Sequence, residues 1–242
     1  MNKILTIAKR EFNTFFDSLI AYIMVVVFFG FSGFFTWLFG ADVFLRGQAS
    51  IAPFFDIAYW ALFFFIPALT MRMFAEEQKS GTIELLLTNP LTDWQIIFGK
   101  FLACLALVGV TLLFSLPYYF TVVWLGPVDH GAVWVGYLGI LLMSSAYIGI
   151  GLFASSITKN QIVAILLALM LNLLFALLFG FLAQASSGGW LANLFDYMSL
   201  RMHYDSMIRG VIDTKDIVYF LSITGFCLVL TEAMLSKRNV VD

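Results

Sequence analysis

The sequence predicts an all-α membrane protein with six transmembrane helices. Of its 242 residues, 62% are hydrophobic and only 12% are charged, whereas soluble domains carry roughly 25% charged residues. The mean hydropathy is +0.95. A transmembrane helix needs roughly 20 mostly apolar residues, and runs of this kind occupy residues 18–41, 53–73, 99–125, 132–157, 160–183 and 217–235. Because these runs are continuous, they favour helices over the alternating strands of a barrel. The length fits one membrane domain spanning residues 1–242.

Residues 1–17 predict an amphipathic helix that lies in the cytoplasmic interface. Apolar side chains recur there at spacings of three and four residues, at Leu5, Ala8, Phe12, Phe15 and Phe16. This helix has two possible roles, simple anchoring or the bracing of a partner. The apolar run that follows is long enough to span, so we expect no cleavable signal peptide.

The distribution of basic residues predicts the orientation. With the N-terminus in the cytoplasm, that side receives nine of them: Lys3, Lys9, Arg10, Arg72, Lys79, Lys100, Lys159, Lys237 and Arg238. The opposite side receives four: Arg46, Arg201, Arg209 and Lys215. Cytoplasmic loops carry an excess of Lys and Arg, so both termini are expected in the cytoplasm, for a protein of the bacterial inner membrane.

The loop at 74–98, between the second and third runs, predicts a helical hairpin at the cytoplasmic surface. Its first helix ends at Asn89 and Pro90, because proline cannot continue a helix. Its second helix begins at Thr92, where Gln95 completes a capping box, and continues into the third span. The hairpin is therefore a rigid lever that is joined to two transmembrane helices.

This part of the chain resembles the ABC-2 class of transporter permeases. The residues that carry the resemblance follow the second span in order: Arg72, Glu76, Glu77, Gly81, Thr82, Glu84, Leu85, Leu86, Pro90, Gly99 and Lys100. The C-terminal third also resembles one branch of that class, the permeases of gliding-motility and nitrous-oxide-reductase maturation systems. The residues for this narrower resemblance run from Arg209 to Asp213 and from Ser236 to Arg238.

The resemblance implies that the loop forms a coupling helix in a cleft of a separate ATPase subunit. The residues expected at that interface are Glu76, Glu77, Lys79, Gly81, Thr82, Glu84, Leu85, Leu86 and Pro90. Alternatively, these charges are only solvated neighbours of lipid headgroups. The resemblance also implies two ATPase copies that bind ATP and Mg, and a second permease that is identical or related. We expect this chain itself to bind no cofactor.

Small residues in the fourth run predict close helix packing rather than a hinge. Ser145 and Gly149, and Gly151 and Ser155, are each four residues apart. In the third run, Pro117 predicts a kink.

The outer segment at 184–216 predicts one or two short helices on or in the outer leaflet before the last span. In this segment Asp205 and Arg209 stand four residues apart and are expected to pair, whereas Asp213 is expected to cap the last span. His203 has no metal-ligand companion at a suitable spacing, so a ligand role is not expected.

The sequence argues against several other functions. A phosphate loop needs Gly-Lys followed by Ser or Thr, and the single Gly-Lys here, Gly99 and Lys100, precedes Phe101. An intramembrane enzyme needs a nucleophile with a base or a metal motif, and an ion-coupled carrier needs ionisable groups near the midplane; neither pattern is present. The net charge of -2 gives no indication of nucleic-acid binding. An ATP-driven envelope assembly factor that moves no cargo stays open as an alternative to an exporter.

Overall fold

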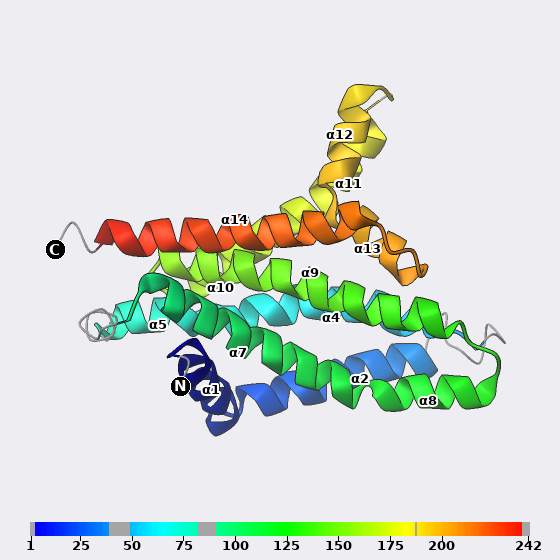
Figure 1. Ribbon diagram of the computed structural model, residues 1–242, viewed down its shortest axis with the longest axis horizontal. Coiled ribbons are helices and arrows are strands. Elements are labelled where there is room, and N and C mark those ends of the chain that lie inside the picture. The colour runs from blue at the N-terminus through cyan, green and yellow to red at the C-terminus, as the bar shows by residue number, and fades with distance from the viewer. Residues whose placement is uncertain (1–2, 39–48, 82–90, 187, 239–242) are drawn as a thin grey trace.

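Every regular element in the described part of the chain is a helix. The computed structural model describes residues 3–38, 49–81, 91–186 and 188–238 (Figure 1). Within these described residues, six stretches are long and apolar enough to cross a membrane: Ile20–Trp37, Ala52–Ser80, Asp93–Leu125, His130–Ile157, Gln161–Ala185 and Thr214–Lys237. These stretches confirm the predicted all-α fold with six spans.

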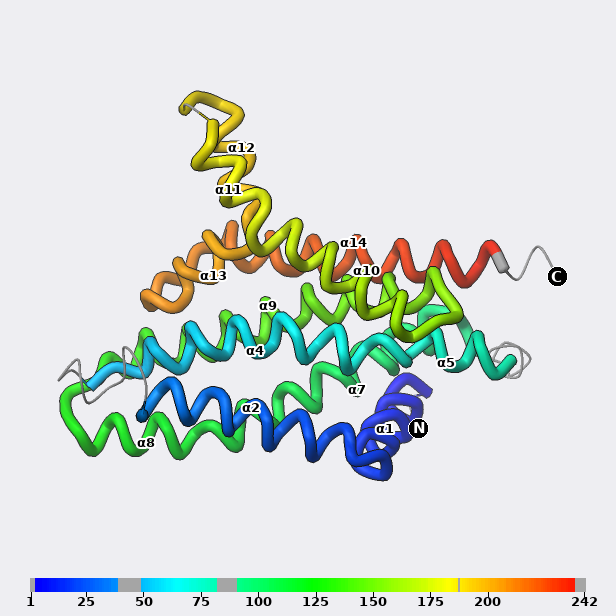
Figure 2. The backbone as a smooth tube through the Cα atoms, turned by 180° about the vertical axis from the view of Figure 1, so that it is seen from behind, coloured from blue at the N-terminus to red at the C-terminus, as the bar shows by residue number. Residues whose placement is uncertain are grey.

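The long helices run along one common axis, which Figures 1 and 2 show from opposite sides. At one end lie α1 (Lys3–Asp17) and the end of α5 (Arg72–Ser80). We name this the α1 end. At the other end α8 (Leu116–Leu125) finishes and α9 (His130–Ile157) begins, so we name it the α8 end.

Helix α9 is the centre of the bundle and packs against six of the neighbouring described helices, including α14 (Thr214–Arg238) and α10 (Gln161–Leu173). Its small residues make the close approach possible. A Cβ atom at Gly149 would lie 3.3 Å from the Cβ atom of Cys227, and one at Gly151 would overlap Thr70. The Ser145 and Thr224 hydroxyls are hydrogen bonded at 3.0 Å. The predicted close packing of this span is confirmed.

The second span continues further than predicted. Helix α4 (Ala52–Thr70) is followed directly by α5, with a break at Met71. The first part of the predicted loop, residues 74–80, is therefore helical and continues the second helical stretch, with Phe74, Ala75 and Gln78 buried. Helix α5 ends at Gly81, whose φ of 72° is the left-handed conformation that glycine adopts readily.

The third span begins with the predicted capping box. Thr92 accepts a hydrogen bond from the Gln95 amide at 3.3 Å, and the Gln95 side chain accepts one from the Thr92 amide at 3.3 Å. Helix α7 (Asp93–Phe114) then runs without interruption into the bundle. It gives way to α8 at Ser115, beside Pro117, which confirms the predicted kink.

The fifth span ends in an arm that leaves the bundle. Helix α10 leads through a π-helix, η1 (Leu174–Leu178), into α11 (Phe179–Ala185), and α12 (Trp190–Met198) returns antiparallel to it (Figure 1). Helix α13 (Leu200–Ile208) then leads to α14. These elements confirm the predicted short helices before the last span.

Two predicted contacts of the outer segment have different outcomes. Asp213 caps α14, since its carboxylate accepts a hydrogen bond from the Lys215 amide at 3.1 Å. The predicted pairing of Asp205 with Arg209 is wrong at the side chains. The Asp205 carboxylate pairs instead with Arg201 at 2.8 Å, and Arg209 donates to the Asp205 carbonyl at 3.1 Å. Arg201 lies one helical turn before Asp205 and so competes with Arg209 for the same carboxylate.

The sequence indicated no partner for His203, but the structure shows two hydrogen-bond partners for its ring. Its Nδ1 atom lies 2.6 Å from a carboxylate oxygen of Asp216, and both side chains are buried. Its Nε2 atom lies 2.9 Å from the carbonyl oxygen of Tyr197. Because a carbonyl oxygen only accepts, Nε2 carries a proton. His203 therefore joins the end of α12 to the beginning of α14.

Candidate functional site

Helix α1 packs against α7 at the α1 end of the bundle. The residues of α1 that become buried are Ile7, Glu11 and Phe15, each four residues apart. Leu5, which the sequence placed on the apolar face, is 61% exposed. The predicted helix is thus present, and the face that packs on α7 differs from the apolar face that the sequence predicts for the membrane interface. A pattern of apolar residues could not identify this face because its central member is a glutamate.

Gly99 permits the close contact between α1 and α7. A Cβ atom at this position would lie 2.5 Å from Cγ2 of Ile7 and 3.4 Å from the carbonyl oxygen of Ile4. Distances of this kind to a β-branched side chain and to backbone leave no room for a methyl group. The glycine is therefore required for α1 to lie on α7.

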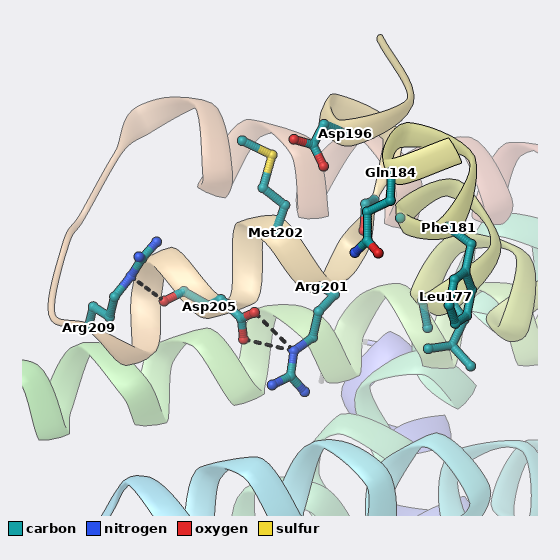
Figure 3. Close-up of a pocket in the computed structure, with 11 residues that line it drawn as sticks. Leu177, Phe181, Gln184, Asp196, Arg201, Met202, Asp205 and Arg209 are labelled. Atoms are coloured by element: carbon teal, nitrogen blue, oxygen red, sulfur yellow. Dashed lines mark hydrogen bonds and ion pairs between the residues drawn. The ribbon is translucent and has the colours of Figure 1, made fainter. Parts of the chain in front are cut away.

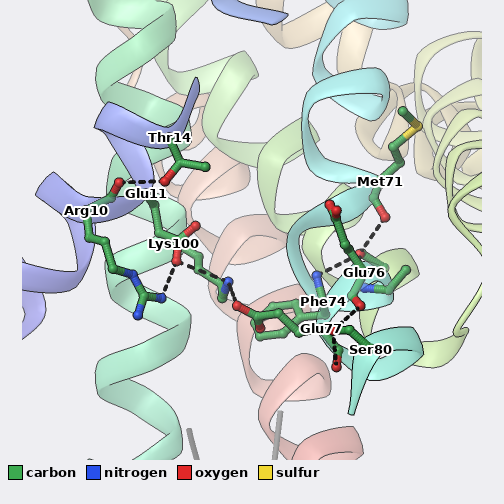
Figure 4. A network of polar contacts seen from close by, with 11 residues as sticks. Arg10, Glu11, Thr14, Met71, Phe74, Glu76, Glu77, Ser80 and Lys100 are labelled. Carbon is green, nitrogen blue, oxygen red and sulfur yellow. Dashed lines mark hydrogen bonds and ion pairs between the residues drawn. The ribbon is translucent and has the colours of Figure 1, made fainter. Parts of the chain in front are cut away.

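Lys100, the next residue, is the centre of an ion network (Figure 4). Its side chain is 1% exposed, and its Nζ atom lies 2.7 Å from Oε1 of Glu77 and 3.4 Å from Oε1 of Glu11. Arg10 contacts the same oxygen of Glu11 at 2.6 Å. The ammonium group also lies 5.3 Å from the ring centre of Phe74. One lysine therefore links α1, α5 and α7 through charge.

The network lowers the pKa of Glu11. Burial alone raises the pKa of this carboxyl, but the positive charges of Lys100 and Arg10 outweigh burial and hold it below its ordinary value. Glu11 is consequently ionised in the folded protein at neutral pH. A cavity of about 310 Å³ lies beside this network, with Arg72 and Glu76 among its lining residues.

Helix α5 is also fastened to α9. The amides of Phe74 and Ala75 both donate to the hydroxyl of Ser155, at 3.0 and 3.1 Å. That hydroxyl donates in turn to the carbonyl of Met71 at 2.9 Å. The Gln78 side chain donates to the carbonyl of Ser156 at 2.9 Å. A serine of α9 therefore satisfies the backbone groups that the break at Met71 leaves without helical partners.

A third contact joins the beginning of α5 to the junction of α1 and α2 (Ile20–Trp37). The Arg72 guanidinium donates to the hydroxyl of Ser18 at 2.9 Å and lies 5.8 Å from the ring centre of Phe15. Helix α5 is thus held on three sides, by α1, α7 and α9. It cannot move alone without breaking one of these contacts.

The structure places four of the nine predicted interface residues. Glu76, Lys79 and Gly81 are exposed at the end of α5, whereas Glu77 turns inward to Lys100. Glu76 and Glu77 therefore lie in different environments. The other five predicted residues, Thr82, Glu84, Leu85, Leu86 and Pro90, lie outside the described residues.

Sequence reasoning missed the partners that make this site a unit. The apolar pattern of residues 1–17 does not indicate a role for Glu11, and the small-residue spacing of the fourth span indicates only packing for Ser155. Lys100 was recognised as part of a motif, but its role as a bridge was not. A lysine at the first turns of a transmembrane run, with glutamates in two flanking helices, was the signal available.

Among the residues that the structure describes, no group of three His, Cys, Asp or Glu side chains is arranged to hold a metal ion. The site is instead an ion network at the base of a loop. This network holds α1, α5 and α7 together, and the exposed charges of Glu76 and Lys79 lie beside the loop.

Comparison with known proteins identifies the family. The family model described as ABC-2 family transporter protein matches residues 5–235. No curated protein matches the chain significantly. Because the match covers nearly the whole chain, including the network around Lys100, this chain belongs to the ABC-2 family of transporter proteins.

Proposed function

We propose that this chain is the membrane-spanning subunit of an exporter that is driven by ATP hydrolysis on separate ATPase chains. The proposal rests on the family and on one observation, the buried bridge from Lys100 to Glu77 and Glu11. Under this proposal the chain carries no catalytic residue and binds no cofactor, and the partner holds ATP and Mg.

The geometry around residues 82–90 supports a mechanical role for that loop. It follows α5, which directly continues the second span, and it precedes α7, which becomes the third span. Neither helix has a flexible connection to the bundle, because α5 follows α4 with a single intervening residue and α7 starts at a capping box. A partner that pushes the loop therefore moves two transmembrane helices.

The ion network supports transmission of this movement. Lys100 of α7 lies 2.7 Å from Glu77 of α5 and 3.4 Å from Glu11 of α1. The exposed charges of Glu76 and Lys79 remain available at the end of α5. Charged groups at such a rim fix the register of a partner and speed association more than they add affinity.

The wider assembly follows from the same proposal. One loop of this kind and six spans make half of a transport unit, so we propose two permease subunits, identical or related, with two ATPase subunits. We place the protein in the bacterial inner membrane, with both termini in the cytoplasm. The resemblance of the C-terminal third favours a gliding-motility type of system.

Co-purification with candidate ATPases tests the docking surface. The double variant Glu84→Arg, Leu86→Asp is expected to lose the ATPase, because it reverses a charge and places a carboxylate in an apolar contact. Lys159→Glu is the matched control, since Lys159 is exposed between α9 and α10 at the same end of the bundle. If the double variant retains the ATPase as well as the control does, the docking assignment is wrong.

Cysteine labelling tests the orientation. Lys79 is exposed near the end of α5, at the α1 end, whereas Lys215 is exposed at the beginning of α14, the helix end that lies away from the α1 end. In intact cells a membrane-impermeant reagent should label Lys215→Cys and not Lys79→Cys. The reverse pattern would place the loop outside the cell, where no ATPase can reach it.

A further inference from the structure

The arm formed by α11 and α12 runs across the direction of the spans. Figures 1 and 2 show it leaving the bundle to one side, with its tip away from every other helix. The two helices pack on each other, and the rings of Phe179 and Phe195 are stacked 6.3 Å apart. If the spans cross a bilayer, the arm lies along the plane of that bilayer.

The arm has the surface of a helix pair in a lipid interface. No residue of α12 is buried, and large apolar or amphipathic side chains are exposed along both helices: Phe181, Leu182, Trp190, Leu191, Leu194, Tyr197 and Met198. Helices with such a surface lie at the boundary between headgroups and acyl chains.

A cavity of about 370 Å³ opens where the arm meets the bundle, between α11 and α13 (Figure 3). One part of its wall is apolar and consists of Leu177, Phe181 and Met202. Four charged side chains also line it: Asp196, Arg201, Asp205 and Arg209. The cavity thus offers apolar and charged surface to one ligand.

The charge of Arg201 is already compensated. Its guanidinium lies 2.8 Å from the Asp205 carboxylate and 2.9 Å from that of Asp56, and 4.7 Å from the ring centre of Tyr59. Asp56 stands near the beginning of α4, at the α8 end. These contacts fasten α13 to the first half of α4, so this side of the cavity lies toward the α8 end of the bundle.

Arg209 and Asp196 differ from Arg201 in having no ion pair among the described residues. Arg209 uses one N–H on the Asp205 carbonyl, and within the described chain its guanidinium has no ion pair. The exposed Asp196 carboxylate lines the same cavity and forms no ion pair with a described residue. Within the described residues, one basic and one acidic side chain without an ion pair therefore line this cavity beside an apolar wall.

We propose that this cavity binds one phospholipid with a zwitterionic phosphoethanolamine headgroup. Its phosphate binds Arg209, its ammonium group donates to Asp196 and to the neighbouring Gln184 amide, and an acyl chain follows Leu177 and Phe181. The lipid belongs to the leaflet at the α8 end, and it holds the arm in that leaflet. This site is independent of the ATPase coupling proposed above, because it lies away from the α1 end.

Lipid binding to the purified full-length chain in detergent tests the site, with native mass spectrometry as the measurement. Dioleoyl phosphatidylethanolamine should bind the wild-type chain roughly tenfold more tightly than dioleoyl phosphatidylglycerol, since the second lacks the ammonium group that a carboxylate binds. Equal binding of the two lipids would overturn the proposal.

Two variants separate the two charges. Asp196→Asn should remove the preference by weakening phosphatidylethanolamine alone, whereas Arg209→Gln should weaken both lipids. Lys215→Gln is the control, because Lys215 is an exposed cation of the same end that does not line the cavity. Unchanged affinity in Asp196→Asn, with an unchanged melting temperature, would contradict the assignment of the ammonium group.

A further comparison tests the lipid against a soluble ligand. Phe181→Ser should weaken phosphatidylethanolamine, while Phe226→Ser, which replaces an equally exposed phenylalanine on α14, should not. Glycerophosphoethanolamine, which has the headgroup without acyl chains, should not compete at the same concentration. If it competes fully, the cavity binds a soluble zwitterion and the lipid assignment is wrong.

Discussion

Lys100 illustrates how one residue organises the α1 end. A lysine whose side chain is 1% exposed is costly to bury unless its charge is paired. Here Glu77 and Glu11 both supply the negative charge, and they come from two different helices. Removing one member of such a buried network leaves the others without compensation.

We expect Lys100→Met to lower the free energy of unfolding by about 3 kcal/mol. This is the lower end of the range for breaking a buried pair, because the Glu77 side chain keeps 18% of its surface exposed. Lys79→Met removes an exposed lysine from the same end of the bundle and should change stability by less than about 0.5 kcal/mol. Thermal unfolding in detergent measures both variants. Equal effects would show that the ion pairs of Lys100 do not stabilise the fold.

The ion network also predicts a pH dependence. Since the pKa of Glu11 is lowered in the folded state, its contribution to stability is fully present above the ordinary pKa of a glutamate, 4.5. That contribution is lost as the pH falls through the lowered value. A spin label at the exposed Asn13 of α1 should therefore become mobile when the pH falls below the lowered pKa of Glu11, because α1 then loses its ion pair with Lys100. In Glu11→Gln the label should show no such transition; a transition that survives in this variant would assign the pH dependence to another group.

For single residues, the sequence predicted contacts between close neighbours in the chain better than contacts between residues of different helices. It predicted the Thr92 and Gln95 cap because both members lie within four residues of each other. It did not predict that Glu11 pairs with Lys100 or His203 with Asp216, since these pairs join helices whose mutual rotation depends on packing. A prediction of buried positions that uses only apolar residues also cannot identify a buried glutamate such as Glu11.

Among the helices, the position of α1 depends on the flat surface that Gly99 gives to α7. Gly99→Val should displace α1, because even a single Cβ atom would lie 2.5 Å from Ile7. Gly109→Val, also on α7, is the control, since a Cβ atom there meets nothing within 4 Å. Labelling of an Ile7→Cys variant, which replaces a side chain that is 7% exposed, should rise only with Gly99→Val. Equal labelling in both backgrounds would contradict the close packing of α1 on α7.

The junction between α5 and α9 depends on Ser155. Ser155→Ala leaves the amides of Phe74 and Ala75 without their acceptor, and each unsatisfied buried group costs about 1–3 kcal/mol. Hydrogen exchange at these two amides should therefore accelerate. Ser222→Ala removes an exposed serine of α14 and should leave them unchanged. Slow exchange in Ser155→Ala would mean that the break at Met71 is satisfied in another way.

The elements themselves were largely predictable from the sequence. The six apolar runs gave the spans, and Pro117 marked the division between α7 and α8. The extension of the second span to Ser80 was not predicted, because Glu76, Glu77 and Lys79 resemble a surface loop in isolation. They continue the helix because its other face, with Phe74 and Gln78, packs on α9. The π-helix in the fifth span carries no composition that would distinguish it from α10.

Considered as a whole, the molecule has a different kind of polar feature at each end. At the α1 end an ion network joins three helices beside the proposed docking loop. Toward the α8 end, the Arg201 cluster supports the cavity and the arm. Between them the bundle is apolar and closely packed around α9. A push on the loop reaches the α8 end only if the helices at the α1 end move as one body.

The distance between two labels on the side of the bundle away from the α1 end, measured in the complete complex with its ATPase, tests this account most directly. The labels replace Trp124 and Lys215, both exposed, in a chain whose buried Cys104 and Cys227 are changed to alanine. Trapping the ATPase in its nucleotide-bound state should change this distance in the otherwise unaltered chain. In Glu77→Gln the complex should still assemble and hydrolyse ATP, but the distance should stay fixed. An equal change in both complexes would contradict transmission through the Lys100 network.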